Sequence, residues 1–178
     1  MAVITARTRT VKLYNFELSF KLPGVNADGE QYLDALYEAG CDDAMIGIGR
    51  KGFIGADFSR ESTSLEIAVD SAIRNIETAI PGAQLIDAGP DLVGASDVAA
   101  ILECSRQNIR QLLTTDESAP IPAYQGKRDL WHCAEVLTWL RDIKGMKIAP
   151  ELIEVSTHAM RFNAAQQSKK AERVAALV

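Results

Sequence analysis

Residues 92–140, LVGASDVAAILECSRQNIRQLLTTDESAPIPAYQGKRDLWHCAEVLTWL, hold the pattern that decides how the second half of this 178-residue chain folds. Ser96 is expected to cap one helix and Ser105 another, because serine side chains accept hydrogen bonds from the free N–H groups of a first helical turn. Glu103 and Cys104 separate the two segments, which predicts two short helices joined by a tight turn. The apolar residues with helical spacing in the first segment are Val98, Ala99, Ile101 and Leu102.

The second helix, Ser105 to about Thr114, is expected to have one apolar and one polar side. Ile109, Leu112 and Leu113 are predicted to point inward. The polar residues crowd its first turns, where a helix in the major groove of DNA meets the bases. Arginine can pair with guanine, glutamine with adenine, and serine or free backbone N–H groups can hold a phosphate. The candidate DNA contacts on this helix are Ser105, Arg106, Gln107, Arg110 and Gln111.

A hairpin with a basic tip is predicted after this helix. Residues 121–124 and 129–131 are expected to form two short strands, with Lys127 and Arg128 at the tip contacting phosphates. A third helix is expected over about Cys133 to Leu140. Trp131 and Trp139 are expected to join the hairpin and the helices in one small core.

This segment resembles the winged helix-turn-helix of excisionase-like and MerR-type DNA-binding proteins. The resemblance rests on the helix over 93–102, Ser105-Arg106-Gln107 with Ile109, the proline-containing wing, and Trp131 followed by a helix that ends in Trp139. It covers under a third of the chain and implies double-stranded DNA as a partner. The family commonly has glycine in the turn where this chain has Glu103, and a left-handed backbone there would strain a glutamate by ~1 kcal/mol. The alternative is a small helical domain that only packs or binds protein.

In the first half of the chain, the spacing of the apolar residues indicates strands as well as helices. The pattern predicts a ferredoxin-like β-α-β-β-α-β sandwich, in which two helices cover one face of an antiparallel sheet. Within the first helix, Tyr32, Leu33, Leu36 and Tyr37 are expected on one side, followed by Gly40 as C-terminal cap. The expected strands are 11–22, 44–48, 53–58 and 83–87, and the expected helices are 28–39 and 62–80.

The whole chain is therefore expected to be α+β with three parts. These are a dimerisation or sensing domain over 1–88, a winged helix-turn-helix domain over 92–145, and a C-terminal helix over 149–178. Residues 88–91, Ala-Gly-Pro-Asp, are the expected hinge. The C-terminal helix has an uneven apolar face, so it either folds back onto its own chain or pairs with a second copy.

Composition favours a soluble regulator over an enzyme. The net charge of −5 is uneven, since residues 1–92 hold eight Lys and Arg against fourteen Asp and Glu, while residues 93–178 hold eleven against ten. Non-specific attraction to DNA should be weak, so binding would need base contacts and a dimer. No apolar run approaches a membrane span, and Met1–Thr10 lacks a signal peptide's apolar segment, so a cytoplasmic protein that does not enter the membrane is expected.

Motifs for catalysis or cofactors are weak in this chain. Gly47 to Gly52 matches G-x-G-x-x-G, but a strand is expected directly after it, which favours a hairpin over a nucleotide site. His132 and His158 lack a nearby nucleophile or metal-ligand spacing, so they are expected to be surface or capping residues. No catalytic residue, metal or cofactor is expected. The three cysteines, Cys41, Cys104 and Cys133, are expected to be reduced and buried.

The sequence thus predicts a DNA-binding transcriptional regulator, a repressor that acts as a homodimer and is not an enzyme. Two alternatives stay open. One is an antitoxin-like module whose acidic residues 1–88 mask a partner protein while it regulates its own operon. The other is an excisionase-like architectural protein that bends DNA.

Overall fold

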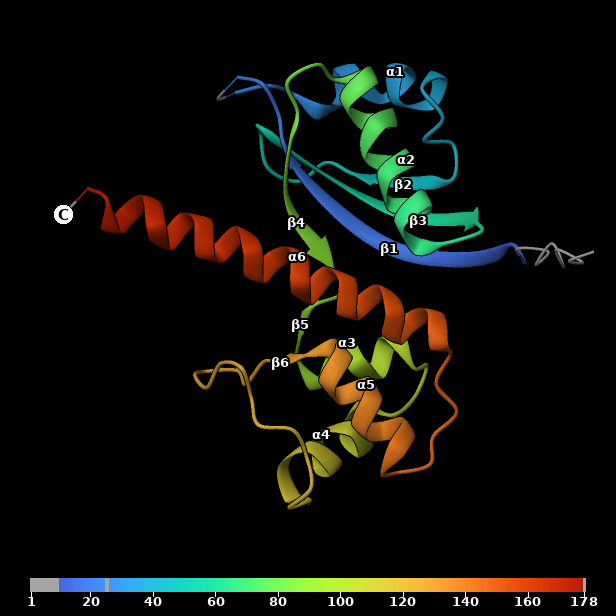
Figure 1. Cartoon of the computed structure of the whole chain (residues 1–178), viewed down its shortest axis with the longest axis vertical. Helices are drawn as coiled ribbons and strands as arrows, with labels where there is room; N and C mark the ends of the chain where they lie inside the picture. The colour runs from blue at the N-terminus through green and yellow to red at the C-terminus, as the bar shows by residue number, and fades with distance from the viewer. Residues whose placement is uncertain (1–9, 25, 178) are drawn as a thin grey trace, which may run out of the picture.

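The computed structural model describes residues 10–24 and 26–177 (Figure 1). The segment considered for a signal peptide, residues 1–9, lies outside them. The described chain is α+β, with a four-stranded antiparallel sheet and six α-helices. Its elements are β1 Lys12–Lys21, the 3-10 helix η1 Gly29–Tyr32, α1 Leu33–Glu38, β2 Ala44–Gly47, β3 Phe53–Ser62, α2 Leu65–Ala79, β4 Gln84–Gly89, β5 Leu92–Val93, α3 Ala95–Ile101, α4 Arg106–Thr115, β6 Trp131–His132, α5 Cys133–Asp142 and α6 Pro150–Ala175.

The large sheet has the strand order β2-β3-β1-β4. Its strands alternate between a buried and an open face, because successive side chains of a strand point to opposite sides. Phe16 and Phe58 are directly opposite each other on the buried face, and their rings stack with centroids 5.2 Å apart. Helices α1 and α2 pack on this face through Leu36, Leu65 and Ile76, among others. The sheet therefore has one covered face and one face that the two helices leave open.

The segment predicted as one helix over 28–39 is split into η1 and α1, and the expected apolar side is wrong in part. Leu36 is buried, but Leu33 and Tyr37 are 40% and 70% exposed. A 3-10 turn has three residues per turn, so it shifts the phase of the helix that follows it, and a six-residue helix then buries a single position. Gly40 ends the helix as predicted, with φ of +91° and with Cys41 N–H donating to the Leu36 carbonyl.

A buried arginine ties β3 to the loop before β2. Arg60 is 8% exposed and donates two hydrogen bonds to the Asp43 carboxylate, at 2.7 and 2.8 Å. The same guanidinium donates to the Gly40 carbonyl and to Ser71 of α2. Buried charges persist when they are paired and hydrogen-bonded. Arg60 therefore has a structural role: it holds β3, the loop before β2 and α2 together beside the core between the sheet and its two helices.

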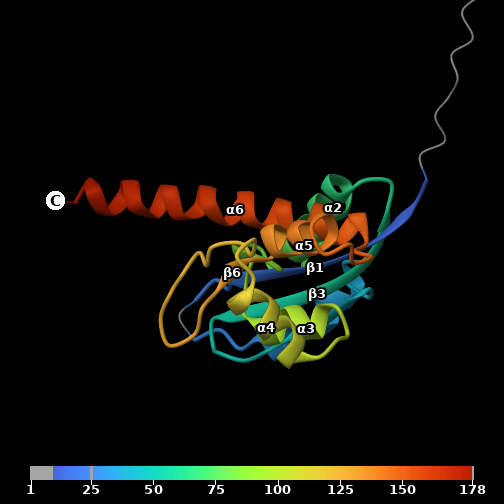
Figure 2. The same cartoon turned by 90° about the horizontal axis from the view of Figure 1, so that it is seen from below.

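A second hydrophobic cluster forms around α3, α4 and α5. Both tryptophans belong to it, as predicted, with Trp131 4% and Trp139 6% exposed. The long helix α6 contributes to both clusters, because Val155 and Ala159 pack against the sheet while Leu152 packs against the second cluster. The first part of α6 thus folds back onto its own chain. Its last turns extend past the sheet edge (Figure 2), and all residues from 167 to 177 are exposed.

The three cysteines are free thiols. Cys41 and Cys133 are buried as predicted, whereas Cys104 is only half-buried. Burial raises the pKa of the Cys133 thiol to about 11. Cys133 is therefore a neutral, apolar side chain in the second cluster.

Candidate nucleic-acid interface

Helices α3 and α4 form the predicted pair joined by a short turn. The first helix begins earlier than expected, because Gly94 is its N-cap and Ser96 lies inside its first turn. The Asp97 carboxylate accepts a 2.8 Å hydrogen bond from the Gly94 N–H and so holds the start of the helix. The predicted Ser96 cap is therefore wrong, because a residue three positions after the N-cap reaches back to it instead.

The turn between these helices has a left-handed residue. Glu103 has a φ of 50°, and it is the one non-glycine residue with positive φ in the described chain. This backbone lets the Cys104 N–H donate to the Ala99 carbonyl at 2.9 Å, which closes the end of α3. A side chain in this region costs roughly 1–2 kcal/mol. The strain expected from the sequence at Glu103 is therefore present.

Helix α4 has the expected two sides. Ile109 is fully buried and Leu113 is 7% exposed, while Leu112 is only half-buried. Ser105 is the N-cap, as predicted, but its side chain makes no capping hydrogen bond. All five candidate contact residues of this helix are exposed: Ser105, Arg106, Gln107, Arg110 and Gln111.

The start of α4 is free to meet an anion. Its first turn contains no acidic residue, so nothing on the helix neutralises the partial positive charge of its N-terminus. Ser105 is exposed at this end, next to the first backbone N–H groups of the helix, and such groups bind phosphate oxygens. Arg106 adds a full positive charge at that position.

The loop after α4 is anchored by both tryptophans. Trp131 Nε1 donates to the Pro120 carbonyl at 3.1 Å, and Trp139 Nε1 donates to Ser118 Oγ at 3.0 Å. Asp116 at the end of α4 pairs with Lys144. These contacts fix the two ends of the loop against the second cluster, while its tip stays exposed.

The hairpin predicted in this loop forms only in part. Tyr124 and Leu130 make one isolated pair, with N–H to carbonyl distances of 3.1 and 2.9 Å. Residues 121–123 form no strand, and the expected second strand is displaced to β6, which pairs with β5. Pro120 and Pro122 lack the N–H that a ladder needs, which accounts for the missing strand. The predicted tip residues Lys127 and Arg128 are exposed.

Helices α3, α4 and α5 lie on the opposite side of α6 from α1 and α2, and the loop after α4 leads from α4 to β6 (Figure 1). Over residues 10–24 and 26–177, no ion pair engages any of the four cations of this region. These are Arg106, Arg110, Lys127 and Arg128.

The open face of the sheet has the opposite charge. Glu17 and Asp57 are directly opposite each other on β1 and β3, and Asp87 of β4 is opposite Ser19 on the same face. Phosphate groups would be repelled there. Among the described surfaces, α4 and its loop are thus the better match for nucleic acid.

A polar junction that the sequence did not predict lies between the sheet, the start of α5 and α6. Asp91, 8% exposed, accepts hydrogen bonds from His132 Nδ1 at 2.7 Å and from Asn163 Nδ2 at 2.9 Å. Asn163 also pairs with both the N–H and the carbonyl of Ala88. The expected hinge over 88–91 is therefore held by hydrogen bonds from two helices. His132 is the N-cap of α5, as its predicted capping role requires, but its side chain bonds to Asp91 rather than to the helix.

The loop from Gly47 to Gly52 joins β2 to β3 as a hairpin. Gly52 has a φ of +81°, and Phe53 begins a strand rather than a helix. The Arg50 guanidinium lies 4.0 Å from the centre of the Phe53 ring. This geometry lacks the helix N-terminus that a dinucleotide site requires.

The described residues contain no group of three or more His, Cys, Asp or Glu that could hold a metal ion. No helix among them is long and apolar enough to cross a membrane. Compared with known proteins, the chain matches no family model, no curated protein and no solved structure.

Proposed function

We propose that this chain is a sequence-specific, DNA-binding transcriptional regulator. The observation that carries the proposal is α4, whose exposed first turns hold Arg106, Gln107 and Arg110 and whose N-terminus is free of acidic residues. A short helix precedes it through a tight, left-handed turn, which resembles a helix-turn-helix. In that motif the second helix lies in the major groove and reads base edges.

The exposed residues have two roles in this proposal. Arg106, Gln107 and Arg110 contact bases, because arginine and glutamine carry the donors that guanine and adenine edges accept. Ser105 and the basic loop tip contact phosphates and position the helix. Gln111, one turn after Gln107, is at the edge of the contact. The loop with Lys127 and Arg128 acts as the wing, which its single Tyr124–Leu130 pair closes at the base.

Residues 12–89 would form a ferredoxin-like sandwich in this proposal. The strand order β2-β3-β1-β4, with α1 and α2 on one face, supports that assignment. This part would dimerise or receive a protein or signal, because a dimer doubles the number of base contacts and reads a palindromic operator. The chain would then repress its own or a neighbouring operon in the cytoplasm by blocking polymerase.

Fluorescence anisotropy with the protein's own upstream DNA tests the proposal. The wild type should bind this DNA tightly and bind a scrambled duplex far more weakly, at two salt concentrations. The double variant R106A/R110A should lose the preference. A matched control, K51A/R74A, removes two exposed positive charges outside α4 and its loop and should keep the wild-type preference. Equal and weak binding to both duplexes would overturn the proposal.

A further inference from the structure

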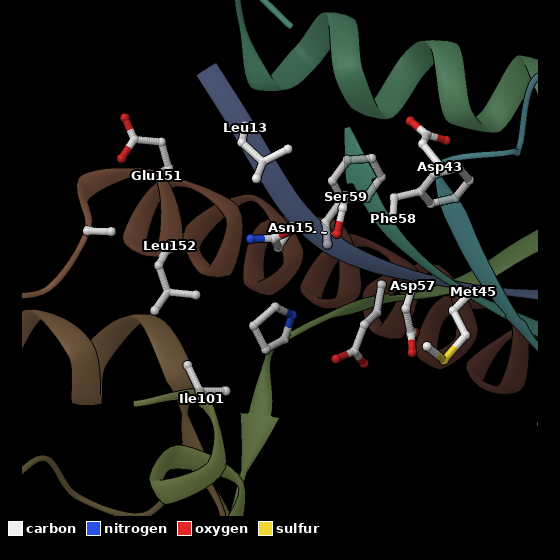
Figure 3. A pocket seen from close by; sticks show the side chains of 14 residues that line it. Leu13, Asn15, Asp43, Met45, Asp57, Phe58, Ser59, Ile101, Glu151 and Leu152 are labelled. Atoms are coloured by element: carbon white, nitrogen blue, oxygen red, sulfur yellow. Dashed lines mark hydrogen bonds between the residues drawn. The ribbon is translucent and has the colours of Figure 1, made fainter. Parts of the chain in front are cut away.

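A groove of about 680 Å³ lies between the open face of the sheet and the second cluster (Figure 3). Strands β1 and β3 form its floor. Its walls come from β2, from the loop after β4, from the end of α3 and from the start of α6. The apolar side chains that Figure 3 shows around it include Leu13, Met45, Ile101 and Leu152.

The floor of the groove has two carboxylates side by side. Glu17 and Asp57 are opposite each other in the β1–β3 register, and like charges at such positions destabilise a sheet. Burial, and then the Asp57 charge, raises the pKa of Glu17. In the described part of the chain neither carboxylate forms an ion pair. A cationic occupant would remove this repulsion.

The other two carboxylates of the groove are already engaged. Arg60 holds Asp43 at 2.7 Å, and Lys12 holds Glu151 at 2.8 Å. The free negative charge of the groove is thus confined to the Glu17–Asp57 pair. Met45, opposite Asp57 on β2, is 75% exposed, and Leu13, four residues before Glu17 on β1, is 51% exposed, so the same groove also offers apolar surface.

The end of α6 has the complementary chemistry. Its last turns are exposed from residue 167 to 177 and reach past the sheet edge (Figure 2). Lys170, Arg173 and Val174 follow the spacing i, i+3, i+4 within α6, with which a helix anchors itself in a groove, and Leu177 lies just after the end of this helix. Val174 and Leu177 are 63% and 86% exposed. We call these four residues the tail stripe.

We propose that the tail stripe of a second copy of this chain docks in the groove, with Lys170 and Arg173 against Glu17 and Asp57. Val174 and Leu177 then cover the apolar wall. In a two-fold dimer each copy gives its tail and receives the other's, which closes the assembly at two chains. A helix ~10 Å across fills 680 Å³ with about one and a half turns, close to the length of the stripe. This inference rests on the homodimer of the proposed function but needs no DNA.

Charge reversal tests this contact by sedimentation equilibrium without DNA. The variants are the groove-reversed E17K/D57K and the tail-reversed K170E/R173E, and each alone should dimerise at least ~10-fold more weakly than the wild type. An equimolar mixture of the two should recover the dimer, because each copy then meets an opposite charge in both contacts. Truncation after Gln167 removes the exposed residues 168–177 together with the last residue of the chain and should also give a monomer. The matched control D34K/E38K carries the same charge change away from the groove and should dimerise normally.

Three results would overturn the docking. If the truncated chain remains a dimer, the copies meet elsewhere, and the homodimer stands without this contact. If the mixture fails to recover the dimer while circular dichroism shows both variants folded, the two charge pairs do not meet. If the wild type is a monomer at every concentration, both the docking and the homodimer are wrong. The anisotropy experiment with DNA then still tests the proposed DNA binding by itself.

Discussion

The Asp91 carboxylate and the His132 imidazole are in contact at 2.7 Å, although 41 residues separate them in the chain. An ionised carboxylate only accepts hydrogen bonds, so His132 Nδ1 carries the proton of this bond. Asp91 directly follows the cis Gly89–Pro90 bond after β4, and its carbonyl accepts from Cys133 N–H at the start of α5. These two contacts join the segment after β4 to the start of α5, which belongs to the second hydrophobic cluster.

Asn163 is the third side chain of this junction, and we expect that replacing it will lower the free energy of unfolding. N163A would lose three hydrogen bonds and leave the buried N–H and carbonyl of Ala88 without their partner. The expected cost is about 2–4 kcal/mol in the free energy of unfolding, measured by urea denaturation. The control Q167A changes an exposed side chain one turn later and should cost under ~0.5 kcal/mol. Equal stability of the two variants would contradict the structural role of Asn163.

Glycine at position 103 should stabilise the protein. Glu103 has a left-handed backbone, which glycine adopts without the steric cost of a Cβ atom. E103G should therefore raise the free energy of unfolding by ~1 kcal/mol. E103A keeps the Cβ atom and removes the charge, so it should give no such gain. A gain from both variants would assign the effect to the glutamate charge instead of the backbone.

Asp116 should titrate well below an ordinary aspartate. Hydrogen bonds from Lys144 and Ser118 lower its pKa from 3.8 to about 2. Because the folded pKa is below the unfolded one, the stabilisation is fully present above pH 3.8 and is lost as the pH falls through about 2. NMR of the Asp116 carboxyl carbon should show this low midpoint, and K144M should move it towards 3.8. An unchanged midpoint in K144M would exclude the lysine as the main cause.

Base and phosphate contacts should respond differently to mutation. R106A should cost ~1–3 kcal/mol in binding free energy and relax the sequence preference at one base pair. K127A should weaken binding to all sequences similarly and flatten its salt dependence, because it removes one phosphate contact. Anisotropy titrations over several operator variants and salt concentrations measure both effects. If the two variants behave alike, the assignment of separate roles is wrong.

Much of the fold was predictable because its signals are local. The strand at 12–21 alternates apolar and polar residues over most of its length, the strands at 44–47 and 53–62 begin as short apolar runs, and α2 and α6 carry helical spacing over many turns. The exposed side of α4 followed from the same spacing, so its five candidate contact residues are exposed as expected. The positive φ of Glu103 agrees with what the family resemblance implies, since that family commonly has glycine in this turn. Each of these features depends on residues within a few positions of one another.

The errors arose where the spacing of apolar residues does not decide the structure. Residues 129–131 were expected to form the second strand of a hairpin, but Trp131 pairs with Val93, almost forty residues earlier. Tyr37 followed the helical spacing but is exposed, since a 3-10 turn changed the phase before α1. Local spacing contains no information about either event.

The sequence by itself determined the order of the elements, the α+β class and the exposed polar side of α4, because hydrophobic periodicity and capping residues act locally. Only the tertiary structure decided where α6 packs, how Asp91 is shared between His132 and Asn163, and that Glu17 and Asp57 meet on one face. Those contacts join residues that are tens of positions apart. Their free energy depends on strand register and helix packing, which are properties of the whole folded chain.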